Sequence, residues 1–298
     1  MKPWLRIILI SFWFLLLFYF SDILHAAEKG ILLSEEVQLK VADSFLEEKE
    51  YYRAVTEFKK FLILFPDSNQ FDYVYWRLGQ AYYLGSEYDQ AVKSFSSLKD
   101  RYYRSPYTPN AVYYEGLSYW KLRQYEKARA SLEDLVREFP DSEAAPESLI
   151  ASSLVSLDEE DIPASKKSLD QLLKGYPDYV KSKPAQDALD LLDHYQNRPQ
   201  KSPFLAGVLS AVLPGAGYFY AEHYADGFTA FLVNALFIAG TITAIHQENY
   251  GLAAIVGGVG LPFYFGNIYG AANAAKKWNL AVRKELRNQI YLTLDFVF

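Results

Sequence analysis

The residues of this chain that could carry chemistry are few and poorly arranged for it. Glu222-His223-x-x-Asp226 brings three ligand-type side chains close in sequence, but metal donors must converge on one point, and a lone loop histidine beside two acids is usually solvated. The acidic run Asp158-Glu159-Glu160-Asp161 lacks the glycine and the spacing of a calcium loop. The sequence contains no nucleophile elbow, phosphate-binding loop or paired-acid motif. We therefore predict no catalytic residue, no metal site and no cofactor, and we expect that the protein is not an enzyme.

Composition narrows the classes of partner. The 298 residues include no cysteine, which excludes disulfides, thiolate metal sites, cysteine catalysis and a lipoprotein anchor. Residues 28–196 contain 21 Lys/Arg against 30 Asp/Glu, whereas residues 197–298 contain 7 against 5. An acidic segment without a basic stripe argues against nucleic acid as a partner.

The N-terminus has the features of an export signal. Lys2 and Arg6 precede an apolar run from Ile7 to Phe20, and the small residues Ala26-Ala27 follow. This pattern predicts a signal peptide over residues 1–27, with an uncleaved anchor as the alternative. Because the positive end stays inside, the residues that follow are expected on the periplasmic side of the inner membrane.

A pattern with a step of 37 residues runs through the middle of the chain. Phe65-Pro66-Asp67-Ser68 returns twice 37 residues later as Phe139-Pro140-Asp141-Ser142, and Tyr102-Tyr103-Arg104-Ser105 between them is a degenerate copy. Each unit contains two stretches with helical spacing of apolar residues, which Gly85-Ser86-Glu87 separates in the second unit. Proline ends one helix pair, and Asp or Ser can cap the next. A period of this length is typical of helical repeats that present extended binding surfaces.

The spacing of small and aromatic residues within a unit resembles the tetratricopeptide repeat (TPR). The resemblance covers about residues 33–182 and depends on Tyr75-x-x-Leu78-Gly79-x-x-Tyr82, then Tyr88-x-x-Ala91 and Phe95. The step is longer than the usual 34 residues, which is similar to periplasmic members that serve outer-membrane assembly and envelope constriction. The resemblance implies an all-α fold, with a TPR-like α-solenoid of four 37-residue units and a capping helix over residues 28–196.

The resemblance also implies where partners bind, because the first helices of successive repeats line the concave face in this family. The inward positions here are Tyr73, Trp76, Gln80, Tyr83, Asn110, Tyr113, Leu117 and Trp120. Rigid rings with a few amides suit a peptide groove. The alternative is that several rings pack between repeats and contact no ligand. These positions lack the Lys/Asn clamp of some peptide-binding members, so capture of a free C-terminus is not expected.

The chain changes character after a polar linker at residues 197–202. The segments Gly227–Ile245 and Gly251–Ala275 carry no charge, and each is long enough to cross a hydrocarbon core. The sequence therefore predicts a transmembrane α-helical domain over residues 203–280, with the lipid bilayer as a partner. A basic segment and a C-terminal tail follow at residues 281–298.

The first apolar segment of this domain, residues 204–220, is expected to be either a kinked crossing or a re-entrant piece, because it contains Pro214 and three following small residues. Its stretch Pro214–Tyr220 resembles a P-G-x-G-Q-x-Y motif of small bacterial membrane domains, with Tyr218 in place of the glutamine. Five basic residues between Lys276 and Arg287 are expected in the cytoplasm by the positive-inside rule. With the repeats outside, this rule requires an odd number of crossings, so we predict three, with two as the alternative.

Small and polar residues are expected at helix contacts within the membrane. Gly266 and Gly270 form a G-x-x-x-G pair that permits close approach, and Asn234 is expected to bond to a neighbouring helix. Gln289–Phe298 alternates apolar and polar residues and is predicted to be a docked edge strand or a disordered end.

These features together predict a scaffold anchored in the bacterial cell envelope, in the inner membrane rather than the outer. Its repeats would lie in the periplasm and bind envelope proteins or peptides. Two alternatives remain open: an accessory or pore-forming subunit of a transport system, and an outer-membrane assembly factor.

Overall fold

The computed structural model describes residues 12–13, 33–197 and 199–296. These residues form helices joined by short turns and include no strand, so the predicted all-α class is confirmed. Apart from residues 12–13, the expected signal peptide at residues 1–27 lies outside the described residues. The chain divides into two compact units, with the boundary between Leu122 and Arg123.

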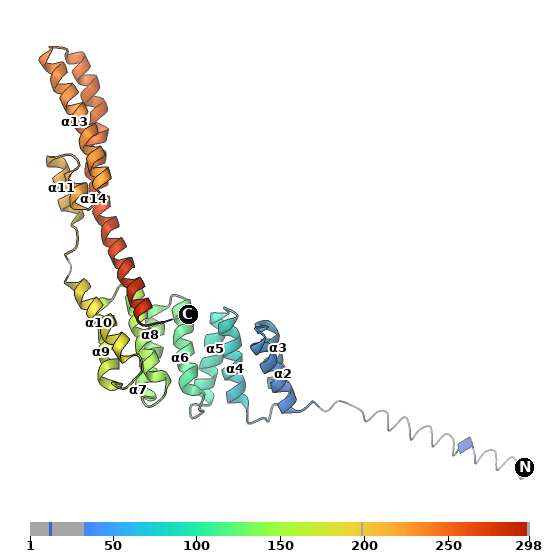
Figure 1. Ribbon diagram of the computed structural model, residues 1–298. Coiled ribbons are helices and arrows are strands. Elements are labelled where there is room, and N and C mark those ends of the chain that lie inside the picture. Colours follow the sequence, from blue (N-terminus) through green and yellow to red (C-terminus); the bar gives the residue numbers. More distant parts are fainter. Residues whose placement is uncertain (1–11, 14–32, 198, 297–298) are drawn as a thin grey trace, which may run out of the picture. The chain divides into compact units, whose positions relative to one another are not determined.

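The first unit contains the helices of the first two repeats and the first helix of the third. Their bounds are α2 (Glu35–Glu47), α3 (Tyr51–Leu64), α4 (Phe71–Leu84), α5 (Tyr88–Arg101) and α6 (Thr108–Lys121). Each of these helices packs against the next one along the chain (Figure 1). The even-numbered helices are the first of their repeats and the odd-numbered ones are the second.

The second unit begins with repeat helices and ends with a long apolar hairpin. Its elements are α7 (Tyr125–Glu138), α8 (Ala144–Asp158), α9 (Ile162–Gly175), α10 (Ser182–Gln196), α11 (Pro203–Val212), α12 (Ala216–Tyr220), α13 (Tyr224–His246) and α14 (Tyr250–Thr293). The pair α8 and α9 forms the fourth repeat, and α10 is the expected capping helix.

The 37-residue step is visible in the backbone at the turn within each repeat. Lys49, Ser86, Arg123 and Glu160 are spaced by 37 residues and have φ angles of 63°, 64°, 57° and 63°. A positive φ is uncommon for a residue that has a Cβ, so one strained residue recurs at the end of each first helix. The repeat is therefore a repeat of conformation as well as of sequence.

The serine of the Phe-Pro-Asp-Ser pattern links successive repeats in the first unit. Ser68 Oγ donates to Glu35 Oε2 at 2.7 Å, and its equivalent Ser105 donates to Asp72 Oδ2 at the same distance. Both acids lie in the first turn of a first helix, where the helix dipole also favours negative charge. One polar contact thus joins each inter-repeat turn to the start of the preceding repeat.

Small residues let the two helices of a repeat pack closely. In the second repeat, a Cβ on Gly79 would clash with the buried ring of Phe95. The fourth repeat departs from this pattern, because serines occupy the equivalent small positions. There Ser153 and Ser165 hydrogen-bond to each other at 2.8 Å, and both are fully buried. Each hydroxyl therefore satisfies the other in a position that excludes water.

Two helices among the described residues, α13 and α14, are long and apolar enough to cross a membrane. The 23 residues of α13 extend about 34 Å at 1.5 Å per residue. Helix α14 continues without a break to Thr293, so the expected strand or disordered end is wrong for residues 289–293. Ile290 and Leu294 are both 0% exposed, whereas Leu292 between them is 80% exposed. This is helical spacing, because a strand would place all three on one face.

The segment expected to be a kinked third crossing turns back instead. It consists of two short helices, α11 and α12, joined by a turn in which Gly215 has a φ of 88°. The 10 residues of α11 extend only about 15 Å, half of a hydrocarbon core. A Cβ on Gly215 would clash with the carbonyl of Gly227, and one on Gly217 with that of Ala206. The glycines of this motif are therefore needed for a tight reversal of the chain.

The two ends of this reversed segment meet at a polar and aromatic cluster. The Ser202 amide donates to the Tyr220 hydroxyl at 2.9 Å, and Lys201 forms a 3.0 Å ion pair with Glu222. Lys201 also exchanges two backbone hydrogen bonds with the Asn279 amide, at 3.0 and 2.8 Å, and its ammonium lies 4.9 Å from the Trp278 ring. The start and the end of the segment are thus held at one level of α14.

Candidate functional site

The eight predicted partner-binding residues belong to α4 and α6, and we call the surface they define the inner face. Three of these side chains are buried in the unit: Trp76, Leu117 and Trp120 are 9%, 6% and 4% exposed. The Trp76 ring lies 5.7 Å from the Phe95 ring and 5.5 Å from the Tyr114 ring. These side chains pack between helices, which was the alternative to ligand contact.

The other inner-face residues remain accessible to a partner. Asn110 is exposed, and the half-buried members are Tyr73, Gln80, Tyr83 and Tyr113. Both Tyr83 and Tyr113 pack edge-to-face against Tyr114, with ring centroids 5.1 and 5.5 Å away. Such contacts hold the rings in place, so the accessible part of the inner face is preorganised.

A polar network on the same face includes two residues that sequence reasoning missed, Asp43 and Arg77. The Tyr73 hydroxyl donates to Asp43 Oδ2 and Arg77 Nε donates to Asp43 Oδ1, both at 2.7 Å. Arg77 also donates to Gln80 at 3.1 Å. The 37-residue period could have predicted one of them, because Asp43 precedes the predicted inner-face residue Gln80 by one step. The network joins the first helices of two repeats and pairs the charge that each contributes.

Tyrosines on the inner face are held in the neutral state. Burial raises the pKa of Tyr73, and its hydrogen bond to Asp43 raises it further. Burial also raises the pKa of Tyr83 and of Tyr114. Neutral phenols add hydroxyl groups to this face without adding charge. The Tyr73 hydroxyl already donates its proton to Asp43, so toward a partner it can only accept.

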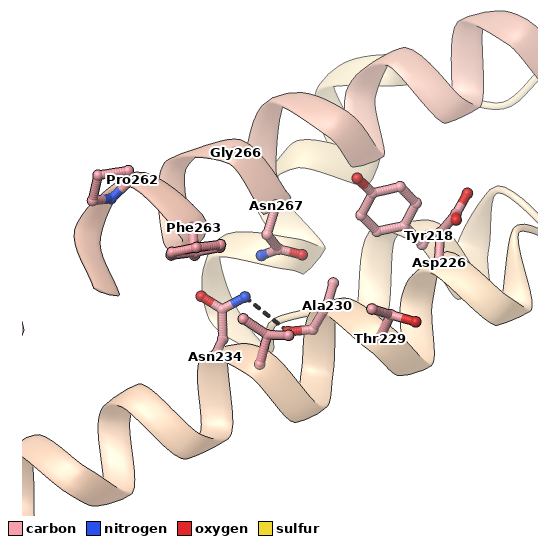
Figure 2. A pocket seen from close by; sticks show the side chains of 10 residues that line it. Tyr218, Asp226, Thr229, Ala230, Asn234, Pro262, Phe263, Gly266 and Asn267 are labelled. Atoms are coloured by element: carbon pink, nitrogen blue, oxygen red, sulfur yellow. Dashed lines mark hydrogen bonds between the residues drawn. The ribbon is translucent and has the colours of Figure 1, made fainter. Parts of the chain in front are cut away.

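Apart from the inner face, a second candidate site is a hollow between α13 and α14, with a volume of about 510 Å³. Figure 2 shows Pro262 and Phe263 at one end and Tyr218 with Asp226 at the other. The hollow has an apolar part and a few amide and hydroxyl groups. Its titratable lining residues are Tyr218 and Asp226.

Asparagines in this region satisfy backbone groups. Asn267 accepts from the Gly215 amide and donates to the Ser210 carbonyl, both at 2.9 Å, and so bridges the two sides of the chain reversal. Asn234 is 3% exposed and donates to the Ala230 carbonyl of its own helix at 2.7 Å (Figure 2). The bond expected from Asn234 to a neighbouring helix is therefore replaced by one within α13.

The two glycines predicted to pack helices differ in their surroundings. A Cβ on Gly270 would clash with the Tyr218 hydroxyl, whereas one on Gly266 would meet no atom within 4 Å. Gly266 instead lines the hollow. Within the described part of the chain, only Gly270 of this pair contacts another element closely.

The acidic residues considered for metal binding have other contacts. His223 Nδ1 lies 3.3 Å from Asp226 Oδ2, but Glu222 pairs with Lys201. In the run that begins at Asp158, Asp161 caps α9 by accepting from the Ala164 amide at 3.0 Å. Among the described residues, no group of three or more His, Cys, Asp or Glu side chains could hold a metal ion.

Comparison with known proteins identifies the repeats. Residues 36–68, 73–102 and 110–142 match the model of the tetratricopeptide repeat family, so these segments are tetratricopeptide repeats. Repeats of this kind serve protein–protein interaction. The fourth helix pair, α8 and α9, continues the pattern outside the matched residues. No curated protein matches the sequence.

Three solved structures illustrate the likeness of fold. A structure described as a MamA RS-1 ArsTM double mutant is 15% identical, with 66% of this chain and 93% of that chain covered and a TM-score of 0.44. A tetratricopeptide repeat protein from Parabacteroides merdae is 16% identical, with 86% and 98% covered and a TM-score of 0.46. PilF from Pseudomonas aeruginosa is 14% identical, with 83% and 97% covered and a TM-score of 0.42.

Proposed function

We propose that this protein is a membrane-anchored scaffold that binds envelope proteins or peptides through the inner face of α4 and α6. The observation that carries the proposal is the accessible, preorganised group of Tyr73, Gln80 and Tyr113 beside the Asp43–Arg77 pair. Rigid rings provide contact area at low entropy cost, and amides and phenols provide hydrogen bonds. Because Asp43 and Arg77 neutralise each other, a partner is recognised by shape and hydrogen bonding rather than by net charge.

The membrane anchor in this proposal is the hairpin of α13 and α14. Helix α13 extends about 34 Å, which matches a hydrocarbon core of about 30 Å. Segment 203–220 is re-entrant in this arrangement, because Ser202 and Tyr220 meet at its two ends. Asn267 supplies the hydrogen bonds that its reversed backbone would lack in lipid. Two crossings then follow the repeats, in place of the three expected from charge.

Two crossings put the repeats and the end of α14 on the same side of the membrane. The export signal favours the periplasm for both, whereas the basic residues after Lys276 favour the cytoplasm. We favour the periplasmic side of the inner membrane. Acids of the fourth repeat pair with two of these basic residues, and this neutralisation weakens the preference of the basic segment for the cytoplasm. Arg283 pairs with Glu160, and Arg287 lies 3.5 Å from Asp158.

The absence of cysteine makes the anchor testable with single substitutions. Asp67→Cys reports the repeats, Gln247→Cys the hairpin turn and Asn288→Cys the end of α14. In spheroplasts, a membrane-impermeant maleimide should label positions 67 and 288 but should reach position 247 only after lysis. Labelling of 67 and 288 from opposite sides would contradict the two-crossing anchor.

Partner binding is tested by a photo-crosslinking amino acid in intact cells. At Tyr113 it should capture a protein, whereas at Ile63, which is 77% exposed on a second helix, it should capture none. Equal capture at the two positions would show that the inner face is not the binding surface.

A further inference from the structure

In the fourth repeat and the capping helix, the positions equivalent to the inner face of α4 and α6 lie against another segment of the chain, and we call these positions the inner face of α8 and α10. Leu157 follows the inner-face residue Trp120 by 37 residues, and Leu191 and His194 follow Gln80 and Tyr83 by three times that step. Leu157 faces a cleft shared with Leu280 and Leu286 of α14, and Leu191 and His194 line another with Trp278 and Leu286. The positions equivalent to those that bind partners in the proposed function therefore lie beside α14, where Leu157 is buried, Leu191 is half-buried and His194 is exposed.

The occupying segment, residues 278–294, is an amphipathic helix. Leu286, Ile290 and Leu294 recur every four residues and are 6%, 0% and 0% exposed, whereas Leu292 is 80% exposed. This is the pattern of an amphipathic helix that anchors one apolar edge in a groove.

Charged contacts flank this apolar edge. Arg283 pairs with Glu160, and Arg287 lies 3.5 Å from Asp158, whose side chain is only 18% exposed. The acidic run at the end of α8 thus has a partner in the basic residues of α14. The Arg283–Glu160 pair lies at the surface, with the Glu160 side chain 61% exposed, whereas the less exposed Asp158 is screened less by solvent. Together the two acids can select a basic amphipathic helix.

We propose that the inner face of α8 and α10 is a binding groove for a basic amphipathic helix, and that residues 278–294 occupy it as an intramolecular ligand. The proposal rests on the use of the inner face for binding in the proposed function, but it names a different part of that face and a different ligand. A partner helix that enters this groove must carry apolar residues four apart with arginines beside them, and it must displace α14.

Residues 278–294 are covalently linked to the groove, and this linkage sets how well an added peptide can compete for it. Linking a ligand to its site gives an effective concentration on the order of millimolar. A free copy of the segment at micromolar concentration therefore cannot displace the tethered one. It binds only when the tethered copy is weakened, which separates a groove with an intramolecular ligand from simple helix packing.

The test uses the full chain in detergent and a fluorescent peptide of residues 276–296. Leu286→Ala with Ile290→Ala weakens the tethered segment, and Asn288→Ala with Leu292→Ala, at two exposed positions outside both clefts, is the matched control. Fluorescence anisotropy should show at least tenfold tighter binding of the peptide to the first variant than to the wild type or the control. A peptide with Arg283→Glu and Arg287→Glu should bind none of them.

Charge exchange keeps the proposal falsifiable if the alanine variant unfolds. Glu160→Arg should open the groove to a peptide that carries the matching Arg283→Glu change, and adding Arg283→Glu to the chain itself should close the groove again. The proposal is overturned if the peptide binds no opened variant that remains folded by circular dichroism, or if it binds the wild type equally well. Crosslinking from Tyr113 tests the proposed function separately, because it does not depend on α14.

Discussion

The same repeat positions have different neighbours in the two units of the molecule. In the first unit, the inner-face residues Gln80 and Tyr83 are half-buried and remain accessible. In the second, the equivalent Leu191 and His194 line a cleft against α14. The difference follows from composition, because the amide of Gln80 and the hydroxyl of Tyr83 suit a wet surface, whereas the half-buried Leu191 presents an apolar side chain to α14. The period thus determines where a residue lies, and the residue type determines what covers it.

The largest expected loss of stability comes from a substitution that disrupts the packing of α14 in the second unit. Ile290→Asp should lower the free energy of unfolding of the second unit by on the order of 5 kcal/mol, because a carboxylate would be buried without a partner. Leu292→Asp, two residues away and 80% exposed, should change it by less than about 0.5 kcal/mol. Urea denaturation followed by limited proteolysis measures both, and equal losses would show that α14 is not docked through Ile290.

A somewhat smaller loss of stability is expected on the inner face of α4 and α6, where it separates buried residues from accessible ones. Trp76→Ala should destabilise the first unit by about 3 kcal/mol, because a large ring packed against Phe95 and Tyr114 is removed. Asn110→Ala should be neutral within about 0.5 kcal/mol. Thermal and urea denaturation distinguish them. Trp76 is therefore a poor probe of partner binding, and a stable Trp76→Ala variant would mean that the ring belongs to the binding surface after all.

The smallest expected effect concerns the contact between repeats. Ser105→Ala should cost about 1 kcal/mol, because it leaves Asp72 without its hydroxyl donor. Ser142→Ala should cost less, because Pro109 stands where the period would place that acid, and the Ser142 hydroxyl instead donates to the Phe139 carbonyl at 2.8 Å. Paired urea titrations measure the difference. The opposite order would remove the role assigned to this serine in joining repeats.

Much of the repeat architecture could be predicted from the sequence, because each signal was local. Proline and serine mark the helix ends, and the small residues at 79 and 153 mark the close contacts. The burial of Trp76 could not be predicted in this way, because an aromatic residue on a helix face is equally compatible with a packed core and with a binding groove. Its surroundings depend on Tyr114, which lies on a different helix.

The hairpin region was predicted less well for two physical reasons. A proline with glycines permits both a kink and a reversal, and the choice depends on Asn267, which satisfies the reversed backbone from 52 residues away. The last ten residues alternate in polarity over too short a stretch to distinguish a strand from a helix. The helical form of residues 289–293 depends on burial of Ile290, which is a tertiary effect.

The most direct test of the covered inner face is a crosslink between the two sides of its ion pair. Asp158→Cys with Arg287→Cys, in a chain with no other cysteine, should form an intramolecular crosslink with a short bis-maleimide in native membranes. Asp158→Cys with Asn288→Cys, where the second position is exposed and one residue further round α14, should react much less. Efficient crosslinking of the first pair alone is the expected result. Equal reaction of both pairs, or none, would contradict the docking of α14 on the fourth repeat.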